Sequence, residues 1–392
     1  MKELIEILKT CRNFPDQSFC LATVVQVEGS SYRKPGARML IFPNGKTVGS
    51  ISGGCLEQDV ILRAQSVFNT RKSIVVTYDT GAEEDIFLGT GLGCKGVIQI
   101  LIEPLGQPEP ANLISFVECL FLKHQRGAVA TVIQAAGATG IKAGDRVMLN
   151  ADGSYRDNVE DAVARNKMIS SLKEILEANR PENLCYEIGE ASLRIFAETI
   201  QPPASLVVFG AGCDAIPLVG LAAAVGYQVT VVDGRPAYAV PERFPQADAV
   251  IAANPENFTE TLDEGASAII MTHNYLTDQG WLKTLLPLGL PYLGLMGPRK
   301  RAEKMLEELR NEGWEPTAKQ LRGLHNPVGL DLGAASPEQI ALAILGEIQA
   351  VSTGHPGGSL RDRKGPIHAA REPETNPVSR VRTAEIACLT LA

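Results

Sequence analysis

The sequence predicts an α/β protein, with an N-terminal α+β domain followed by a C-terminal domain built on a parallel sheet. The first part contains two short apolar runs around Asn44-Gly45, a dipeptide that favours the tight turn of an antiparallel hairpin. From Ser205 onward, strand-like runs rich in valine and isoleucine alternate with helix-like segments, which is typical of parallel sheets with crossover helices. The two patterns indicate two domains of different kinds.

A pair of prolines marks the boundary between these domains. Gln201-Pro202-Pro203 interrupts both patterns, because proline has no amide hydrogen to donate to a helix or a sheet. After about residue 351 the composition shifts to glycine, proline, arginine and serine, which is typical of flexible segments. We therefore expect an N-terminal domain over 1–200, a C-terminal domain over 204–350 and a flexible tail over 351–392.

Composition and charge exclude several classes of function. The chain has 392 residues and a net charge of −8, and an acidic surface repels the phosphates of nucleic acids, so we expect no nucleic-acid partner. Its eight cysteines include no pair with CxxC spacing, the usage of a cytoplasmic protein with reduced thiols. Every apolar run is shorter than the ~20 residues that a membrane-spanning helix needs, so we expect no membrane partner. The sequence shows no recognisable internal repeat.

Hydrophobic spacing predicts the elements of the N-terminal domain. A first helix is expected near the N-terminus, where Leu4, Leu8 and Cys11 share one helical face. Another helix is expected to begin close to Cys55. The other strands and helices of this domain are expected at 19–27, 39–42, 47–51, 73–78, 97–102, 128–133 and 192–200, and near 111–125 and 158–178.

A glycine-rich turn opens the C-terminal domain. Gly210-Ala211-Gly212-Cys213-Asp214-Ala215 follows an apolar strand and precedes a helix, which is the setting of the GxGxx(G/A) turn of Rossmann-type domains. Gly210 would allow the tight turn, and Gly212 would let the backbone approach a phosphate at the helix N-terminus. Asp233 ends the next strand, where an acidic side chain can accept hydrogen bonds from a ribose. The turn could equally serve the βαβ geometry alone.

Cations and hydroxyls gather in one loop of the N-terminal domain. The segment 28–38 contains Ser30, Ser31, Arg33, Lys34 and Arg38 in a chain that is otherwise acidic. A positive, hydroxyl-lined loop is suited to an anionic ligand. Such residues are also common in ordinary solvated loops, so the segment by itself leaves both interpretations open.

Two cysteines lie beside glycines. Gly53-Gly54-Cys55 precedes the expected helix, whose N-terminus favours the thiolate form and hence metal or sulfur chemistry. Cys94 follows a second glycine-rich run and precedes Lys95, a cation that also favours a thiolate. We predict functional roles for these two thiols. Cys213 stays open, and the remaining cysteines are expected to be small core residues.

These segments, taken together, resemble the XdhC/CoxI family. The N-terminal markers are Gly29-Ser30-Ser31, Arg33, Gly36-Ala37-Arg38-Met39 and the segment 52–57. The markers in the C-terminal domain are, in order, 210–217, 232–235, 242–245, 272–273, 294–299 and 327–334. The resemblance extends over about 15–350. The sequence departs from the family pattern at Lys95, which stands where the family has a glycine after the cysteine.

The resemblance implies a maturation factor without turnover of its own, so no catalytic residue is assigned. Such a factor would bind molybdenum cofactor, in a mononucleotide or dinucleotide form, and deliver it to an apo molybdenum hydroxylase of the xanthine or carbon monoxide dehydrogenase type. A cysteine desulfurase would be a further partner in sulfuration, and a homodimer is the default assembly. Cys55 is the expected metal ligand, because a thiolate is a soft donor that suits molybdenum. The other expected cofactor-binding residues are Ser30, Ser31, Arg33, Arg38, Gly53, Gly54, Cys94, Gly210, Gly212, Asp214, Asp233, Arg235, His273 and Arg299.

Two further hypotheses remain open from the sequence. In an NAD(P)-dependent oxidoreductase, Asp233 would select NAD and His273 would act as acid or base. His273 and Arg299 stand at expected strand ends, the side of a parallel sheet where ligands collect, although Arg299 and Arg235 could simply be solvated charges. In a scaffold protein, the C-terminal domain would only dock a partner.

Overall fold

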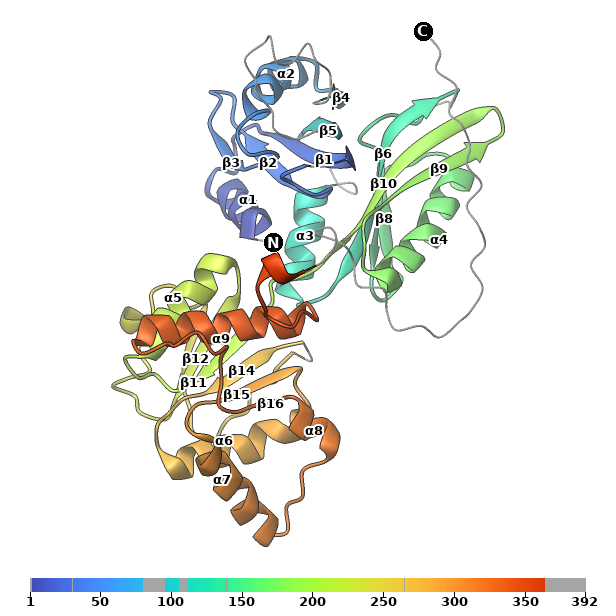
Figure 1. The fold of residues 1–392 in the computed structure, drawn as a ribbon. Helices are drawn as coiled ribbons and strands as arrows, with labels where there is room; N and C mark the ends of the chain where they lie inside the picture. Colours follow the sequence, from blue (N-terminus) through green and yellow to red (C-terminus); the bar gives the residue numbers. More distant parts are fainter. Residues whose placement is uncertain are drawn as a thin grey trace.

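The computed structural model describes residues 2–29, 31–79, 96–105, 112–137, 140–263 and 265–363. It contains two antiparallel sheets and one parallel sheet, each with helices packed against it. The antiparallel sheets form the upper part of the molecule in Figure 1, and the parallel sheet forms the lower part. The expected fold class, a Rossmann-type domain behind an N-terminal α+β domain, is confirmed.

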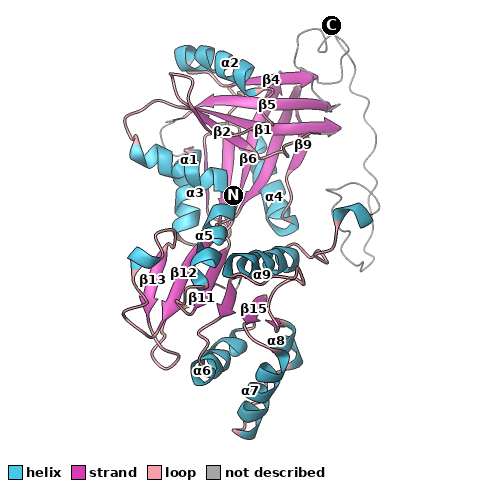
Figure 2. Ribbon diagram, turned by 60° about the vertical axis from the view of Figure 1, so that its left-hand side comes forward, coloured by secondary structure: helices cyan, strands magenta, loops and turns pink. Residues whose placement is uncertain are grey.

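The first sheet contains the predicted hairpin. Its strands, in spatial order, are β3 (Thr47–Gly49), β2 (Arg38–Ile41), β1 (Cys20–Gly29), β5 (Gly96–Pro104) and β4 (Ile74–Asp79). Between β2 and β3 the chain turns at Gly45, whose φ of +81° is one that glycine adopts without strain. Helix α2 (Glu57–Thr70) covers one face of this sheet, where its Val60, Ala64 and Val67 are buried (Figure 2).

The second sheet is built in the same way. Its strands, in spatial order, are β8 (Tyr155–Asp157), β7 (Arg146–Asn150), β6 (Gly127–Ala136), β10 (Ala191–Ile200) and β9 (Glu182–Ile188). Helix α4 (Ala162–Ala178) covers its outer face, with Met168 and Leu172 in the core. The sequence pattern indicated β6, β10 and α4, whereas β7, β8 and β9 come from the structure.

The two sheets are copies of one unit, although the sequence shows no recognisable repeat. Each unit runs three strands, one helix and two strands, and each has the same strand order. The match extends to single hydrogen bonds. Gly36 N donates to Val24 O at 2.8 Å in the first unit, and Gly144 N donates to Val132 O at 2.9 Å in the second. The repeat is hidden in the sequence because most side chains differ, and only a short match such as KPGAR with KAGDR survives.

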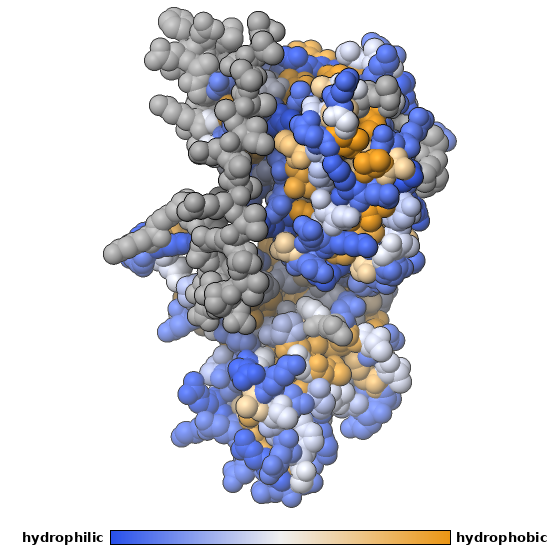
Figure 3. All heavy atoms as spheres, turned by 90° about the vertical axis from the view of Figure 1, so that its right-hand side faces the viewer, coloured by the Kyte–Doolittle hydropathy of each residue, from blue (hydrophilic) through white to orange (hydrophobic). Residues whose placement is uncertain are grey.

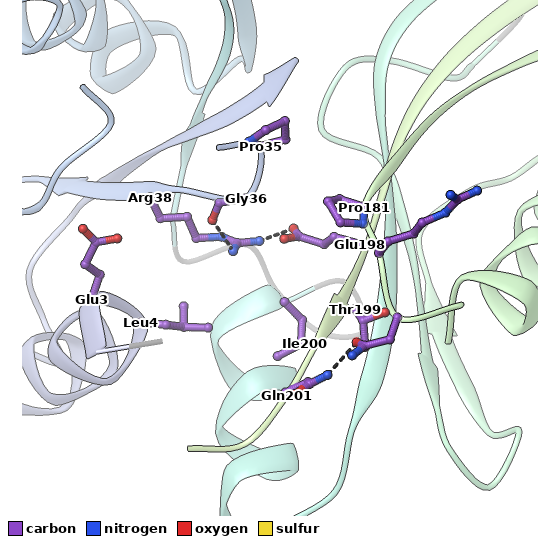
Figure 4. Close-up of a pocket in the computed structure, with 12 residues that line it drawn as sticks. Glu3, Leu4, Pro35, Gly36, Arg38, Pro181, Glu198, Thr199, Ile200 and Gln201 are labelled. Carbon is purple, nitrogen blue, oxygen red and sulfur yellow. Dashed lines mark hydrogen bonds and ion pairs between the residues drawn. The ribbon is translucent and has the colours of Figure 1, made fainter. Parts of the chain in front are cut away.

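Two buried ion pairs join the units, and each pair consists of one residue from each unit. Arg38 of the first unit pairs with Glu198 of the second, and Arg146 of the second pairs with Glu103 of the first. All four side chains are at least nine-tenths buried. Figure 4 shows Arg38 reaching Glu198 between the units, beside a cavity of about 220 Å³. Burial raises the pKa of Glu198 even though Arg38 opposes the shift, so desolvation outweighs attraction here.

Two helices connect the units to each other and to the C-terminal domain. Helices α1 (Lys2–Asn13) and α3 (Leu113–Leu122) bury apolar side chains in one cluster with residues of both sheets. Strand β10 ends at Ile200, and the next strand begins at Ser205. Lys2 at the start of α1 packs against Gly226. Just after α3, His124 Nδ1 lies 3.3 Å from Asp263 Oδ2 of the C-terminal domain. On the face that Figure 3 shows, the upper and lower parts form two masses whose surfaces mix polar and apolar residues.

The third sheet is parallel and has the strand order 3-2-1-4-5-6 of a dinucleotide-binding fold. Its strands are β13 (Ala249–Ala252), β12 (Gln228–Asp233), β11 (Ser205–Phe209), β14 (Ser267–Ile270), β15 (Tyr292–Leu295) and β16 (Leu324–His325). Helices α5 (Ala215–Val225) and α9 (Pro337–Ser352) pack on one face, against Leu206 and Val208. Helices α6 (Tyr275–Leu285) and α7 (Arg299–Asn311) pack on the other face, against Val207 and Phe209.

Short elements complete the chain. They are α8 (Ala318–Arg322) and the 3-10 turns η2 (Pro241–Arg243), η3 (Leu286–Leu288) and η4 (Leu360–Asp362). Most of the expected tail, residues 364–392, lies outside the described residues. In the part of the chain that the structure describes, no helix has both the length and the apolar character that a membrane crossing requires.

The reciprocal ion pairs generate a testable prediction about stability. Glu198→Ala leaves the Arg38 guanidinium buried without its counter-charge and is expected to destabilise the protein by about 3–5 kcal/mol. The double variant Arg38→Met/Glu198→Leu removes both charges, and its free energy of unfolding is expected to fall much less. Urea unfolding measures the free energy of unfolding of both variants. Glu312→Ala, which breaks the exposed pair with Lys283, serves as control and should change stability by under about 1 kcal/mol. Equal losses in the single and double variants would contradict the interpretation.

Candidate functional site

Several strands of the first sheet begin or end at one edge of the N-terminal domain. At the end of β1, Gly29 pairs with Gly96 at the start of β5, and Asp79 at the end of β4 pairs with Val97. The chain therefore leaves the described sheet at Asp79 and re-enters it at Gly96 on the same edge as the loop after Gly29. Two predicted site residues, Ser30 and Cys94, lie outside the described residues.

A hydrogen-bonded cage holds the segment from Gly53 to Cys55 at this edge. The Ser52 hydroxyl accepts from the amides of Gly54, Cys55 and Leu56 at 3.1–3.2 Å and donates to the Glu57 carboxylate. Glu57 also accepts from Ser52 N and Ser50 Oγ, both at 2.9 Å. The backbone amides of the loop that leads into α2 are thereby satisfied.

The cage fixes the charge of Glu57. Partial burial works against the carboxylate, but the hydrogen bonds from Ser52 and Ser50 outweigh it and hold the pKa of Glu57 below its ordinary value. The side chain is thus ionised at neutral pH and keeps the loop in place. In the sequence, Glu57 stands out only as part of a family marker. Its position five residues after Ser52 does not match the capping-box spacing that would have revealed the role.

Cys55 is presented at the surface by this arrangement. Gly53, Gly54 and Cys55 are all exposed, while Leu56 beside them is buried. Gly54 has a φ of +108°, which other residues rarely adopt, and nothing lies within 4 Å of the position of a Cβ there. The exposed Tyr32 ring lies 3.7 Å from the corresponding position at Gly53. A thiol, open backbone and an aromatic ring therefore share one accessible surface.

The duplicated unit shows which features are special to this edge. At the equivalent point in the second unit, Asp161 caps α4 by accepting from the amides of Val163 and Ala164 at 2.8 Å. That cap is an ordinary way to begin a helix. The first unit instead has two glycines and a cysteine before α2, which has no side-chain cap, and Ser52 and Glu57 bond the backbone of that loop. A requirement of the fold alone does not explain this difference.

The predicted cations of the loop are partly neutralised within the protein. Arg33 pairs with Glu3 of α1, and its amide donates weakly to Ser31 Oγ at 3.4 Å. Arg38 is buried and bonds to Gly36 O and Glu198, so it joins the two units and does not lie on the loop surface as expected. Lys34 is exposed. The surface around Cys55 is thus less positive than the sequence suggested.

The other predicted residues collect at the carboxyl edge of the parallel sheet. Gly210 follows β11 with a φ of +128°, and a Cβ there would lie 2.5 Å from Met271 O, so only glycine fits. Asp214 Oδ2 lies 2.6 Å from His273 Nε2, across the switch point between β11 and β14. His273 is exposed and has a positive φ of 61°. Arg299 is the exposed first residue of α7 on the same edge.

Asp233 and Arg235 bind each other. The Asp233 carboxylate accepts from Arg235 Nε and N at 2.9 Å and from Arg235 Nη2 at 2.7 Å. It also accepts from Ala211 N at 2.7 Å. Burial opposes ionisation, but these bonds hold the pKa of Asp233 below its ordinary value. Asp233 therefore fixes the glycine turn, and a ribose could bind to it only by displacing Arg235.

The expected metal site is a single thiol in this structure. Among the described residues, no group of three or more His, Cys, Asp or Glu side chains is arranged to hold a metal ion. Cys55 would therefore act as one exposed ligand to a metal that brings its other ligands with it.

The cage predicts the reactivity of Cys55. Ser52→Ala removes the acceptor of three amides and a donor to Glu57, so the segment 53–55 should loosen and the alkylation rate of Cys55 should change at least several-fold. Mass spectrometry of the Cys55 peptide after timed exposure to iodoacetamide measures the rate. Ser66→Ala, which changes an exposed serine on α2, is the control. An unchanged rate in Ser52→Ala would show that the cage does not control the thiol.

Comparisons with known proteins place the chain in a family. The model described as the XdhC and CoxI family matches residues 15–79, and the model described as the XdhC Rossmann domain matches residues 206–348. A Bacillus subtilis protein, named as a probable subunit of xanthine dehydrogenase, is 34% identical over 330 residues, 84% of this chain and 91% of that protein. The Escherichia coli molybdenum cofactor insertion chaperone PaoD is 21% identical over 333 residues, 84% and 82% of the two chains.

A solved structure is similar over nearly the whole chain. The crystal structure of a xanthine dehydrogenase from Bacillus halodurans matches with a TM-score of 0.71 and 29% identity, over 93% of this chain and 97% of that one. Both matched models occur in their expected order along the chain, and the relatives are matched over most of their length. The chain belongs to the XdhC and CoxI family.

Proposed function

We propose that this protein binds molybdenum cofactor as cargo and supports the maturation of a molybdenum hydroxylase of the xanthine dehydrogenase type. The names of its relatives support this role, since one is a probable subunit of xanthine dehydrogenase and another is a molybdenum cofactor insertion chaperone. The observation that carries the proposal is the exposed Cys55, held on a caged glycine loop that the second unit lacks.

The residues around Cys55 fit such a cargo. The cofactor would supply a molybdenum centre already bound by the sulfur atoms of its own dithiolene, so one added thiolate from the protein is a chemically suitable contact. Gly54 leaves the backbone open beside the thiol, since nothing lies within 4 Å of its Cβ position. Tyr32 offers an aromatic face beside them, suited to a flat ring system. These groups bind and orient; none of them is required to transfer a proton or an electron.

The remaining steps of the role follow from the names of the relatives and from the family resemblance of the sequence. Delivery to an apo-hydroxylase, sulfuration with a cysteine desulfurase and the nucleotide form of the cargo are parts of the proposal without a contact of their own in this structure. The alternative of an NAD(P)-dependent oxidoreductase gains nothing from the geometry, because Asp233, its expected ribose ligand, is bound to Arg235.

Cofactor retention tests the proposal. After incubation with molybdenum cofactor and gel filtration, Cys55→Ala is expected to retain at least tenfold less molybdenum and pterin than the unmodified protein, because the thiolate contact is lost. Metal analysis and the fluorescence of released, oxidised pterin give the two amounts.

A matched variant controls for the loss of a thiol. Cys185→Ala removes another exposed cysteine, on β9 of the second unit, and should retain cofactor normally. Activity gained by an apo-hydroxylase mixed with the same samples measures transfer. Equal retention by the Cys55 and Cys185 variants would exclude Cys55 as the ligand, and no retention by any of the proteins would reject the binding role.

A further inference from the structure

The glycine turn after β11 has the position of a phosphate site. It lies at the carboxyl edge of the parallel sheet, where the strand order reverses between β11 and β14. Dinucleotides bind to Rossmann domains there, with the pyrophosphate close to the second glycine and to the helix N-terminus. Gly210 and Gly212 are both present, so the backbone of the turn is of the right kind.

The space over the second glycine is taken by a side chain of the turn itself. A Cβ on Gly212 would lie only 2.5 Å from Asp214 Oδ1. The Asp214 carboxylate therefore occupies the space that the glycine leaves free. Its other oxygen, Oδ2, is held by His273 Nε2 at 2.6 Å, and only about a fifth of the side chain is exposed. An internal anion thus stands where an incoming phosphate would need to approach.

The ribose position is occupied as well, by an independent set of contacts. Asp233 at the end of β12 accepts two hydrogen bonds from the Arg235 side chain and two from backbone amides. Arg235 is further held by the Tyr238 ring, whose centroid lies 4.0 Å from its guanidinium carbon. The phosphate position over Gly212 and the ribose position at Asp233 are therefore both occupied by side chains of the protein itself.

We propose that Asp214 is the specificity-determining residue of this turn and that its carboxylate makes the Rossmann domain reject NAD(P) and other ligands that present a phosphate there. Two like charges would meet in a partly buried space, so repulsion adds to the desolvation of both. A dinucleotide would also have to break the Asp233–Arg235 pair. The inference goes beyond the proposed function, since it concerns a different surface and holds whether or not Cys55 binds cargo.

Removing the carboxylate should open the site. Binding of NAD⁺ and of inorganic pyrophosphate is measured by calorimetry on the full chain, for the unmodified protein, Asp214→Ala and Asp214→Asn. The unmodified protein is expected to show no saturable binding at millimolar ligand. Asp214→Ala should gain at least tenfold in affinity for pyrophosphate, and Asp214→Asn should gain less because its amide still fills the space.

A control separates the local effect from the change in net charge. Asp248→Ala removes the same charge from the opposite edge of the sheet, where Asp248 accepts from Val229 N, and should leave binding unchanged. Thermal unfolding confirms that each variant is folded, and Asp214→Asn provides the test if the alanine variant is not. The proposal is overturned if the unmodified protein binds NAD⁺ and Asp214→Ala weakens it. It is equally overturned if the Asp214 variants gain no more affinity for pyrophosphate than Asp248→Ala does.

Discussion

The N-terminal domain depends on two buried charge pairs that exchange partners between its halves. These pairs, Arg38 with Glu198 and Arg146 with Glu103, join the facing sides of two copies of one unit. Neither copy can therefore neutralise its buried charges by itself. Such pairs contribute little net stability, because desolvation offsets much of their attraction, but losing a single partner is costly. Together with the apolar clusters that both sheets share, they determine how the units face each other.

Duplication provides an internal comparison that separates fold from function. Both units need a helix to begin after their third strand, and in the second unit an aspartate cap is sufficient. In the first unit two glycines and an exposed thiol precede the helix, and Ser52 and Glu57 on either side of them bond the loop backbone. The proposed cargo contact therefore lies in one copy, while the other copy buries its back face.

The parallel-sheet domain keeps the Rossmann topology while its nucleotide contacts are taken by its own side chains. Gly210 is still required, because the turn passes within van der Waals distance of the Met271 carbonyl. Gly212 makes room for Asp214, and Asp233 anchors the turn through Ala211. A fold shared with dinucleotide enzymes is therefore weak evidence for their chemistry. Which groups face the carboxyl edge decides what can bind there.

Features that depend on local spacing could be predicted from the amino-acid sequence: the hairpin at Asn44-Gly45, the alternation of strands and helices after Ser205, the glycine turn and the glycine-flanked setting of Cys55. Hydrophobic period and turn residues are local signals, so they can be read in a single chain. The tertiary structure alone decided the duplication, the burial of Arg38, and the pairing of Asp214 with His273 and of Asp233 with Arg235. Those outcomes depend on which side chains meet across strands and sheets, and a charge written in the sequence does not show whether its partner comes from the protein or from a ligand.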